Sequence, residues 1–161
     1  MADIISIAVN VESAQAYVDR KGTELKQAIG HGIDLVNTMF ADRVRNNLSG
    51  SVLKTVTGKL LNTVQQQDAV SNGDVVTGSV TAGGPEAPYG IYFEEGGTGP
   101  YEIRPVSASV LAFMSEGQQI FAKVVHHPPI PKLPWFSVEM EQAREDMISQ
   151  INNAFDEVLS T

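Results

Sequence analysis

The chain has 161 residues, of which 42% are hydrophobic and 19% are charged, and it contains no cysteine. These values indicate a globular protein and exclude thiolate metal centres, iron–sulfur clusters and cysteine catalysis. The net charge of −8 is concentrated in residues 61–161, which hold four Lys and Arg against thirteen Asp and Glu, whereas residues 1–60 hold seven against six. Because affinity for nucleic acid depends on clustered Lys and Arg, we expect no tight DNA binding.

Neither a targeting segment nor a membrane segment is apparent near the N-terminus. No basic stretch followed by an apolar run occurs there, so we predict no signal peptide. The uninterrupted apolar runs are only a few residues long, far short of the roughly 20 residues that a membrane helix needs. We therefore expect a protein made in a reducing cytoplasm, with no membrane partner.

The first third of the chain predicts a strand and then a long helix. β-Branched residues dominate Ile4–Val11, which is typical of a strand. Apolar residues then recur at spacings of three, four or seven from Thr23 to Leu48, and this period predicts one face of a helix. Gly30 and Gly32 weaken the helix. We interpret them as points where it packs closely on a sheet, and a kink in the helix is the alternative. Ser49-Gly50 predicts its end.

The middle of the chain predicts a β-hairpin and a structured loop. Residues 51–61 fit either a short helix or a loop that leads into a strand. The strands Asn62–Val70 and Val75–Thr81 are separated by Ser71-Asn72-Gly73-Asp74, whose Asn-Gly pair suits the positive φ angles of a hairpin turn. Residues 83–100 form a Gly- and Pro-rich loop that we expect to pack against another surface, because it carries Tyr89, Tyr92 and Phe93.

The last third predicts further strands, an extended arm and a helix. The strands are Tyr101–Arg104, Val110–Met114 and Ile120–Val125, and four prolines keep His126–Pro134 extended. Pro134 is predicted as the first residue of a terminal helix. The apolar stripe of that helix comprises Met140, Ala143, Met147, Ile151, Ala154 and Val158. The sum is one α+β domain over residues 1–161, in which a mainly antiparallel β-sheet packs against a long helix in the N-terminal half and a C-terminal helix, with long Gly/Pro-rich loops.

The strongest candidate for chemistry is the pair His126-His127. Neighbouring residues of an extended segment point to opposite sides, so the two rings are poorly placed to bind one metal together. Glu94 or Glu95 could complete a site, and a small cytoplasmic metal-dependent enzyme or binding domain that uses Glu95, His126 and His127 is therefore the alternative function. Gly96–Gly99 lacks the Lys and the following helix of a phosphate-binding loop. No catalytic constellation emerges, and we predict no enzymatic activity, no metal and no cofactor.

Two segments suit contact with another protein. They are the glycine-rich aromatic loop Tyr89–Thr98 and the proline-rich arm His127–Pro134 with the following Trp135-Phe136. Rigid segments with aromatic anchors lose little entropy on docking. The alternative is that both segments cap the core of their own domain, and residue types alone favour neither. The candidate interface residues are Tyr89, Tyr92, Phe93, Glu95, Gly97, Thr98, His127, Pro128, Trp135 and Phe136.

Short motifs follow the predicted strand and long helix in a familiar order. They are Thr57-Gly58-Lys59-Leu60, a Tyr-x-x-aromatic-x-Glu-x-Gly-Thr pattern from Tyr89 to Thr98, Ile103-Arg104-Pro105, Leu111-Ala112-Phe113, Val125–Pro128 and Pro134-Trp135-Phe136. In this order the chain resembles the neck or tail-completion proteins of long-tailed double-stranded DNA bacteriophages, small virion proteins at the head–tail junction. The likeness spans nearly the whole chain. It departs at one extra residue in the Tyr89–Thr98 pattern, at Gly96 in place of an aromatic residue, and at Pro129 in place of a glycine.

The resemblance implies a structural virion protein of a tailed phage or prophage, made in the host cytoplasm. It would act as a neck, tail-completion or tail-terminator subunit whose partners are copies of itself, closed into a ring, and the neighbouring connector and tail proteins. The Tyr89–Thr98 loop and the Pro128–Phe136 arm would lie in these contacts. DNA would pass through the ring without specific binding, along an acidic wall, although the negative charge could equally serve solubility alone.

Overall fold

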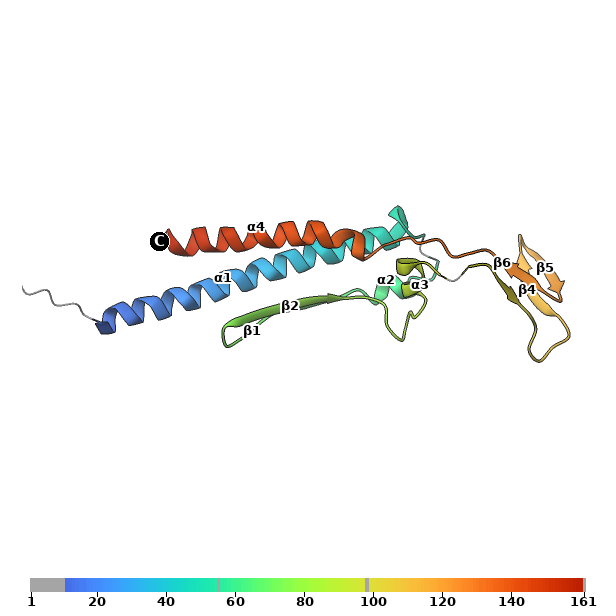
Figure 1. Ribbon diagram of the computed structural model, residues 1–161, viewed down its shortest axis with the longest axis horizontal. Helices are drawn as coiled ribbons and strands as arrows, with labels where there is room; N and C mark the ends of the chain where they lie inside the picture. The colour runs from blue at the N-terminus through green and yellow to red at the C-terminus, as the bar shows by residue number, and fades with distance from the viewer. Residues whose placement is uncertain (1–10, 55, 98, 161) are drawn as a thin grey trace, which may run out of the picture. The chain divides into compact units, whose positions relative to one another are not determined.

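The computed structural model describes residues 11–54, 56–97 and 99–160 (Figure 1). Contacts divide the chain into unit 1 (Met1–Val44, Val64–Thr81, Glu139–Thr161) and unit 2 (Arg45–Thr63, Ala82–Val138). Helices and antiparallel strand pairs confirm the α+β class. A single domain over the whole chain stays a prediction. The predicted opening strand lies outside the described residues except for Val11, which begins a helix.

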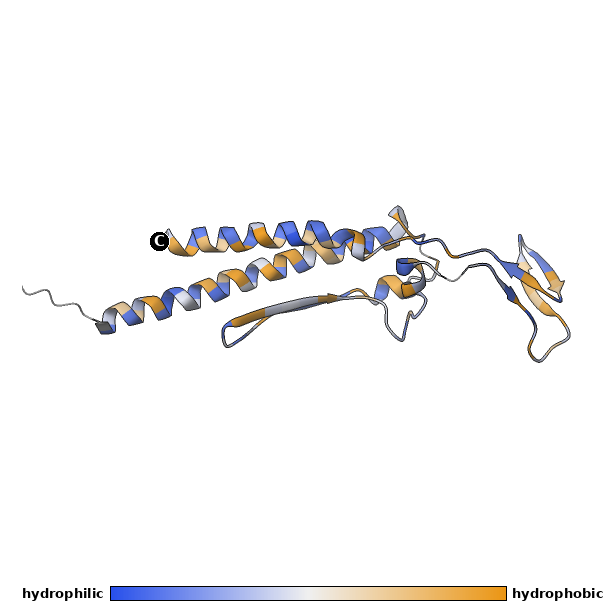
Figure 2. Cartoon of the chain, in the orientation of Figure 1, coloured by the Kyte–Doolittle hydropathy of each residue, from blue (hydrophilic) through white to orange (hydrophobic). Residues whose placement is uncertain are grey.

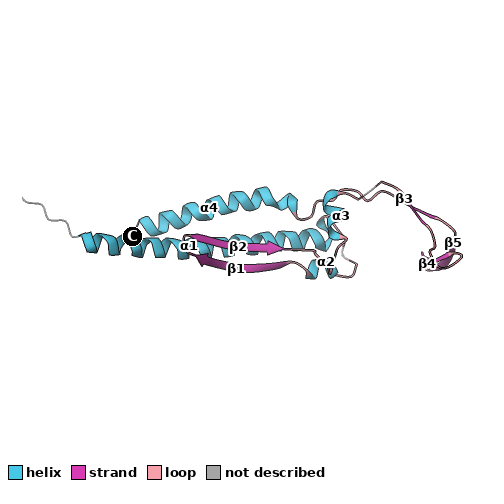
Figure 3. Ribbon diagram, turned by 60° about the horizontal axis from the view of Figure 1, so that its bottom comes forward, coloured by secondary structure: helices cyan, strands magenta, loops and turns pink. Residues whose placement is uncertain are grey.

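Unit 1 contains two long helices that run antiparallel and side by side, α1 (Val11–Asn46) and α4 (Met140–Leu159) (Figures 1 and 3). The two helices approach each other closely at Gly32, because a Cβ there would lie 3.0 Å from Cβ of Gln150. Nearer the C-terminal end of α4, Lys21 Nζ donates a hydrogen bond to the carbonyl of Val158 at 2.8 Å. This cation stabilises the negative end of the α4 helix dipole. The last turn of α4 has no basic residue of its own for this role.

An ion pair and an apolar stripe complete the contact between the two helices. Arg43 on α1 donates a hydrogen bond to Asp146 on α4, and this bond lowers the pKa of the Asp146 carboxyl. The buried apolar side chains of the pair are Ile33, Val36, Phe40, Ala41, Val44, Ala154 and Val158. The predicted helices are therefore confirmed. α1 begins at Val11, earlier than the predicted Thr23. Its first turns were missed because Lys21 and Gly22 interrupt the apolar spacing between Val18 and Leu25.

The predicted hairpin is also confirmed, as β1 (Gln65–Asn72) and β2 (Val75–Thr81), and it lies along α1 (Figure 3). Gly73 has φ of 63° in the turn. The absence of a side chain at Gly78 lets the hairpin approach α1, because a Cβ would lie 2.6 Å from Cγ2 of Ile33. The Asp34 carboxylate accepts a hydrogen bond from the Ala69 N–H at 2.6 Å and ties α1 to β1.

Unit 2 consists of short elements. They are the π turn η1 (Asn47–Ser51), α2 (Lys59–Asn62), α3 (Gly90–Glu95), β3 (Tyr101–Ile103), β4 (Leu111–Ser115), β5 (Gln118–Ala122), β6 (Val125–His127) and the start of the 3-10 turn η2 (Ser137–Glu139). β3 pairs with β6 and β4 pairs with β5, both antiparallel. With β1–β2 they form three separate two-stranded ladders. Gly50, with φ of 134°, marks the predicted end of the long helix.

Two details of unit 2 differ from the sequence prediction: the short helix α3 replaces part of the predicted loop, and the predicted strand Ile120–Val125 is divided between β5 and β6. For residues 51–61, where a short helix and a loop were both open, the structure has the short helix α2 at the end of the segment. Pro134 does not begin the terminal helix, which starts at Met140 after the 3-10 turn η2. Among the described residues, no helix is both long enough and apolar enough to cross a bilayer.

Candidate functional site

The predicted glycine-rich loop and proline-rich arm lie against each other within unit 2. The N–H of Leu133 donates to the carbonyl of Phe93 at 2.7 Å, and the N–H of Gly97 donates to the carbonyl of Ile130 at 3.2 Å. A Cβ on Gly97 would lie 2.7 Å from Cβ of Ile130, so only glycine permits this approach. The loop and the arm therefore form one structural element, although they are separated in sequence.

Trp135 is the buried centre of this element, with 4% of its surface exposed. Its indole Nε1–H donates to the carbonyl of Gly90 at 3.1 Å, and its own carbonyl accepts a hydrogen bond from Asn47 Nδ2 at 3.1 Å. The ring also lies edge-to-face on Phe136 at 5.7 Å. A Cβ on Gly90 would come within 2.9 Å of Leu60 Cδ1, so the glycine lets these apolar side chains meet. Of the two interpretations of Trp135, its burial favours the core of its own chain.

Glu94 connects α3 to the end of the arm. Its carboxylate accepts hydrogen bonds from the N–H groups of Trp135 at 2.9 Å, Phe136 at 3.0 Å and Ser137 at 2.9 Å. Partial burial raises the pKa of this carboxyl, but the bonds from Ser137, Phe136 and Trp135 outweigh it and leave the pKa below its ordinary value. The sequence suggested Glu94 as an aid to a metal site, whereas the structure gives it this capping role.

The two histidines lie on the β3–β6 ladder. The His127 ring stacks on Tyr101 with a centroid distance of 4.9 Å, and its Nδ1 is 2.7 Å from the carbonyl oxygen of Pro128. His126 Nδ1 is 3.7 Å from Glu102 Oε1. In the part of the chain that the structure describes, no three His, Cys, Asp or Glu residues are grouped so that they could hold a metal ion. The alternative site of Glu95 with both histidines is therefore not assembled.

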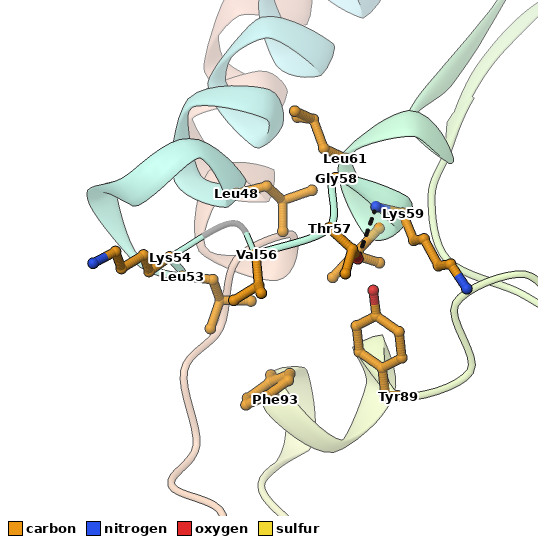
Figure 4. A pocket seen from close by; sticks show the side chains of 11 residues that line it. Leu48, Leu53, Lys54, Val56, Thr57, Gly58, Lys59, Leu61, Tyr89 and Phe93 are labelled. Carbon is orange, nitrogen blue, oxygen red and sulfur yellow. Dashed lines mark hydrogen bonds between the residues drawn. The ribbon is translucent and has the colours of Figure 1, made fainter. Parts of the chain in front are cut away.

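An apolar pocket of about 530 Å³ lies in unit 2 between the residues that follow α1 and the helix α3 (Figure 4). Tyr89 and Phe93 contribute their rings from α3 and the residue before it, and Thr57 lies opposite them (Figure 4). Val56 is 93% exposed. The lining residues are Leu48, Leu53, Lys54, Val56, Thr57, Gly58, Lys59, Leu60, Leu61, Tyr89 and Phe93.

The charged groups of the pocket are both cationic. The ammonium groups of Lys54 and Lys59 point away from the apolar centre on two sides (Figure 4). The chain reaches this place through a wide turn in which the N–H groups of Val52 and Leu53 both donate to the carbonyl of Asn47, at 3.1 and 2.9 Å. The result is a hydrophobic hollow with a basic rim.

Of the predicted interface residues, Tyr89 and Phe93 line the pocket. Leu53 and Val56 also line it, but the sequence analysis did not predict them as interface residues. The sequence feature that could have indicated them is the spacing of three and four between the apolar residues Leu53, Val56 and Leu60, within residues 51–61. Tyr92 and Glu95 are exposed on α3, and Pro128 is exposed on the arm. Thr98 lies outside the described residues.

A second exposed apolar surface lies on the β4–β5 hairpin, where Figure 2 shows hydrophobic residues in orange. Phe113 pairs with Ile120 on one face, whereas Met114 and Phe121 lie on the other. Met114 is 66% exposed and Phe121 is 62% exposed. Apolar side chains therefore face water on both sides of a two-stranded hairpin.

Comparisons of this chain with protein-family models, with curated proteins and with solved structures find no match. The phage likeness stated above thus rests on the residues and motifs of the chain itself.

Proposed function

We propose that the protein is a structural virion subunit of a tailed bacteriophage or prophage, which closes with copies of itself into a ring at the head–tail junction as a neck, tail-completion or tail-terminator protein. One observation carries the proposal, namely the apolar surface of unit 2 that the chain leaves uncovered. A two-stranded hairpin is marginally stable in water by itself, and a large exposed apolar patch marks a site of association. Partner proteins would cover the β4–β5 hairpin and the pocket.

The resemblance to phage neck proteins suggests that the assembly is a ring. Two of its motifs, Thr57–Leu60 and the start of the Tyr89–Thr98 pattern, line the same pocket although they are distant in sequence. This supports a shared role for them. A ring needs heterologous contacts, in which one surface of a subunit meets a different surface of its neighbour. Two unlike apolar surfaces on unit 2 meet that requirement.

The charge of the chain suits a conduit for DNA. Residues 61–161 hold four Lys and Arg against thirteen Asp and Glu, so they offer few sites for phosphate binding. In this proposal an acidic surface from these residues faces the lumen, and DNA passes without being retained.

Disruption of the gene in the phage or prophage that encodes it tests the proposal. We expect DNA-filled heads and separate tails in electron micrographs, and joined particles again when the intact gene is supplied in trans. Infectious particles of normal appearance without this protein, or purified particles that lack it, would contradict a role at the junction.

A further inference from the structure

The pocket requires an occupant that is apolar and carries negative charge. Its walls are hydrocarbon and aromatic, whereas Lys54 and Lys59 are the charged residues of its lining. Apolar burial stabilises such a contact, and charge complementarity selects the partner. The described residues leave about 530 Å³ of this pocket unfilled, and Val56 in its lining is 93% exposed.

The β4–β5 hairpin has both properties. Glu116 is its single charged residue from Leu111 to Ala122, and it lies in the turn with φ of 51°. Met114 and Phe121 flank this turn on one face of the hairpin. Paired strands lie about 4.8 Å apart, so a hairpin tip is narrow enough to enter a hollow that opens at the surface.

We propose that the β4–β5 hairpin of one copy docks in the pocket of the next copy, with Met114 and Phe121 against its apolar walls and Glu116 facing Lys54 and Lys59. This inference rests on the self-association in the proposed function and names the contact that produces it. Each copy carries one hairpin and one pocket, both in unit 2. The contact is therefore heterologous, and its repetition around an axis closes a ring.

Disulfide cross-linking tests the contact directly, because the chain has no cysteine of its own. Val56→Cys and Phe121→Cys replace exposed side chains, so both variants are expected to keep the native melting temperature. Mixed and gently oxidised, they should form a linked dimer at least about tenfold faster than Val56→Cys mixed with Val75→Cys, an exposed control position in unit 1. The double variant should form a ladder of linked multimers.

Charge reversal provides a second measurement. Glu116→Lys should weaken self-association about tenfold in sedimentation experiments, and the addition of Lys54→Glu and Lys59→Glu to the same chain should restore it. Glu86→Lys, which reverses an exposed charge elsewhere in unit 2, should have no effect.

The outcomes separate this contact from the proposed function. Cross-linking of Phe121→Cys with Val56→Cys at the control rate overturns the contact, as does faster linkage of Val56→Cys to itself, which indicates a symmetric pocket-to-pocket dimer. If the rates agree with the prediction but particles lack the protein, the contact stands and the role at the phage junction fails.

Discussion

The carboxylate of Glu94 holds three backbone N–H groups that lie 41 to 43 residues further along the chain. The N–H groups of Trp135 and Phe136 would otherwise be unpaired polar groups in a partly buried place, which costs free energy. A single acidic side chain thereby joins α3 to the end of the proline-rich arm. At the scale of residues, this carboxylate fixes the backbone that leads into η2.

Glu94→Gln should lower the free energy of unfolding by about 1–2 kcal/mol at neutral pH, because the amide NH₂ meets N–H donors and the charge is lost. The pKa of Glu94 is lowered in the folded state from its ordinary value of 4.5. Its stabilisation is therefore complete above about pH 4.5 and is lost as the pH falls through the lowered pKa. Urea denaturation at neutral and acidic pH measures this: the difference between the proteins should shrink in acid.

The exposed neighbour Glu95 is the matched control, and Glu95→Gln should leave the urea midpoint unchanged at both pH values. Equal effects of the two substitutions would remove the capping role of Glu94.

Trp135 and Tyr92 were both predicted as interface residues, and stability separates them. Trp135→Ala should cost about 3–5 kcal/mol of unfolding free energy, because it removes a buried ring. Tyr92 is 53% exposed, so Tyr92→Ala should cost under about 0.5 kcal/mol and act on assembly instead. Thermal denaturation and the mass of assemblies measure the two effects. A Tyr92→Ala variant that assembles as the native protein does would remove Tyr92 from the interface.

At the scale of elements, two glycines of α1, Gly22 and Gly32, have different surroundings. Gly22 has no atom within 4 Å of a Cβ placed on it, whereas Gly32 packs against Gln150 of α4. The same substitution therefore adds the same helix propensity at both positions but meets a neighbour at one of them. The interpretation of Gly32 as a point of close packing is confirmed, although its partner is a helix rather than a sheet.

Gly22→Ala should raise the free energy of unfolding by about 0.5–1 kcal/mol, because alanine restricts the unfolded chain and favours helix. Gly32→Ala should lower it, since the new Cβ must displace α4 and the cost exceeds the gain in propensity. Chemical denaturation of both variants measures the difference. If Gly32→Ala stabilises the protein as much as Gly22→Ala does, α1 and α4 do not pack as closely as described.

The whole molecule combines a small core with exposed apolar surface and a strong negative charge. More large hydrophobic side chains are exposed than buried among the described residues. Charge of one sign keeps such a chain soluble before its surfaces are covered. We expect the same negative charge to lower the affinity of the protein for DNA.

Duplex DNA should bind with a dissociation constant weaker than about 10⁻⁴ M at physiological salt, because the net charge of −8 opposes phosphate contact. An electrophoretic mobility assay measures this. A complex at this salt whose affinity falls steeply as salt is added would reveal a basic surface and contradict the proposed acidic lumen.

The sequence by itself determined the elements whose cause is local. The hairpin turn at Gly73-Asp74, the apolar period of α1 and α4 and the break at Gly50 depend on residues within a few positions of one another, so each was predicted close to its place. The first turns of α1 were missed, because Lys21 and Gly22 interrupt the apolar spacing between Val18 and Leu25. Tertiary structure alone decided the roles of Trp135 and Glu94, whose partners lie more than forty residues away. It also decided the pocket, because Leu53 and Val56 meet Phe93 only when α3 folds against the residues after α1, and no local pattern encodes that contact.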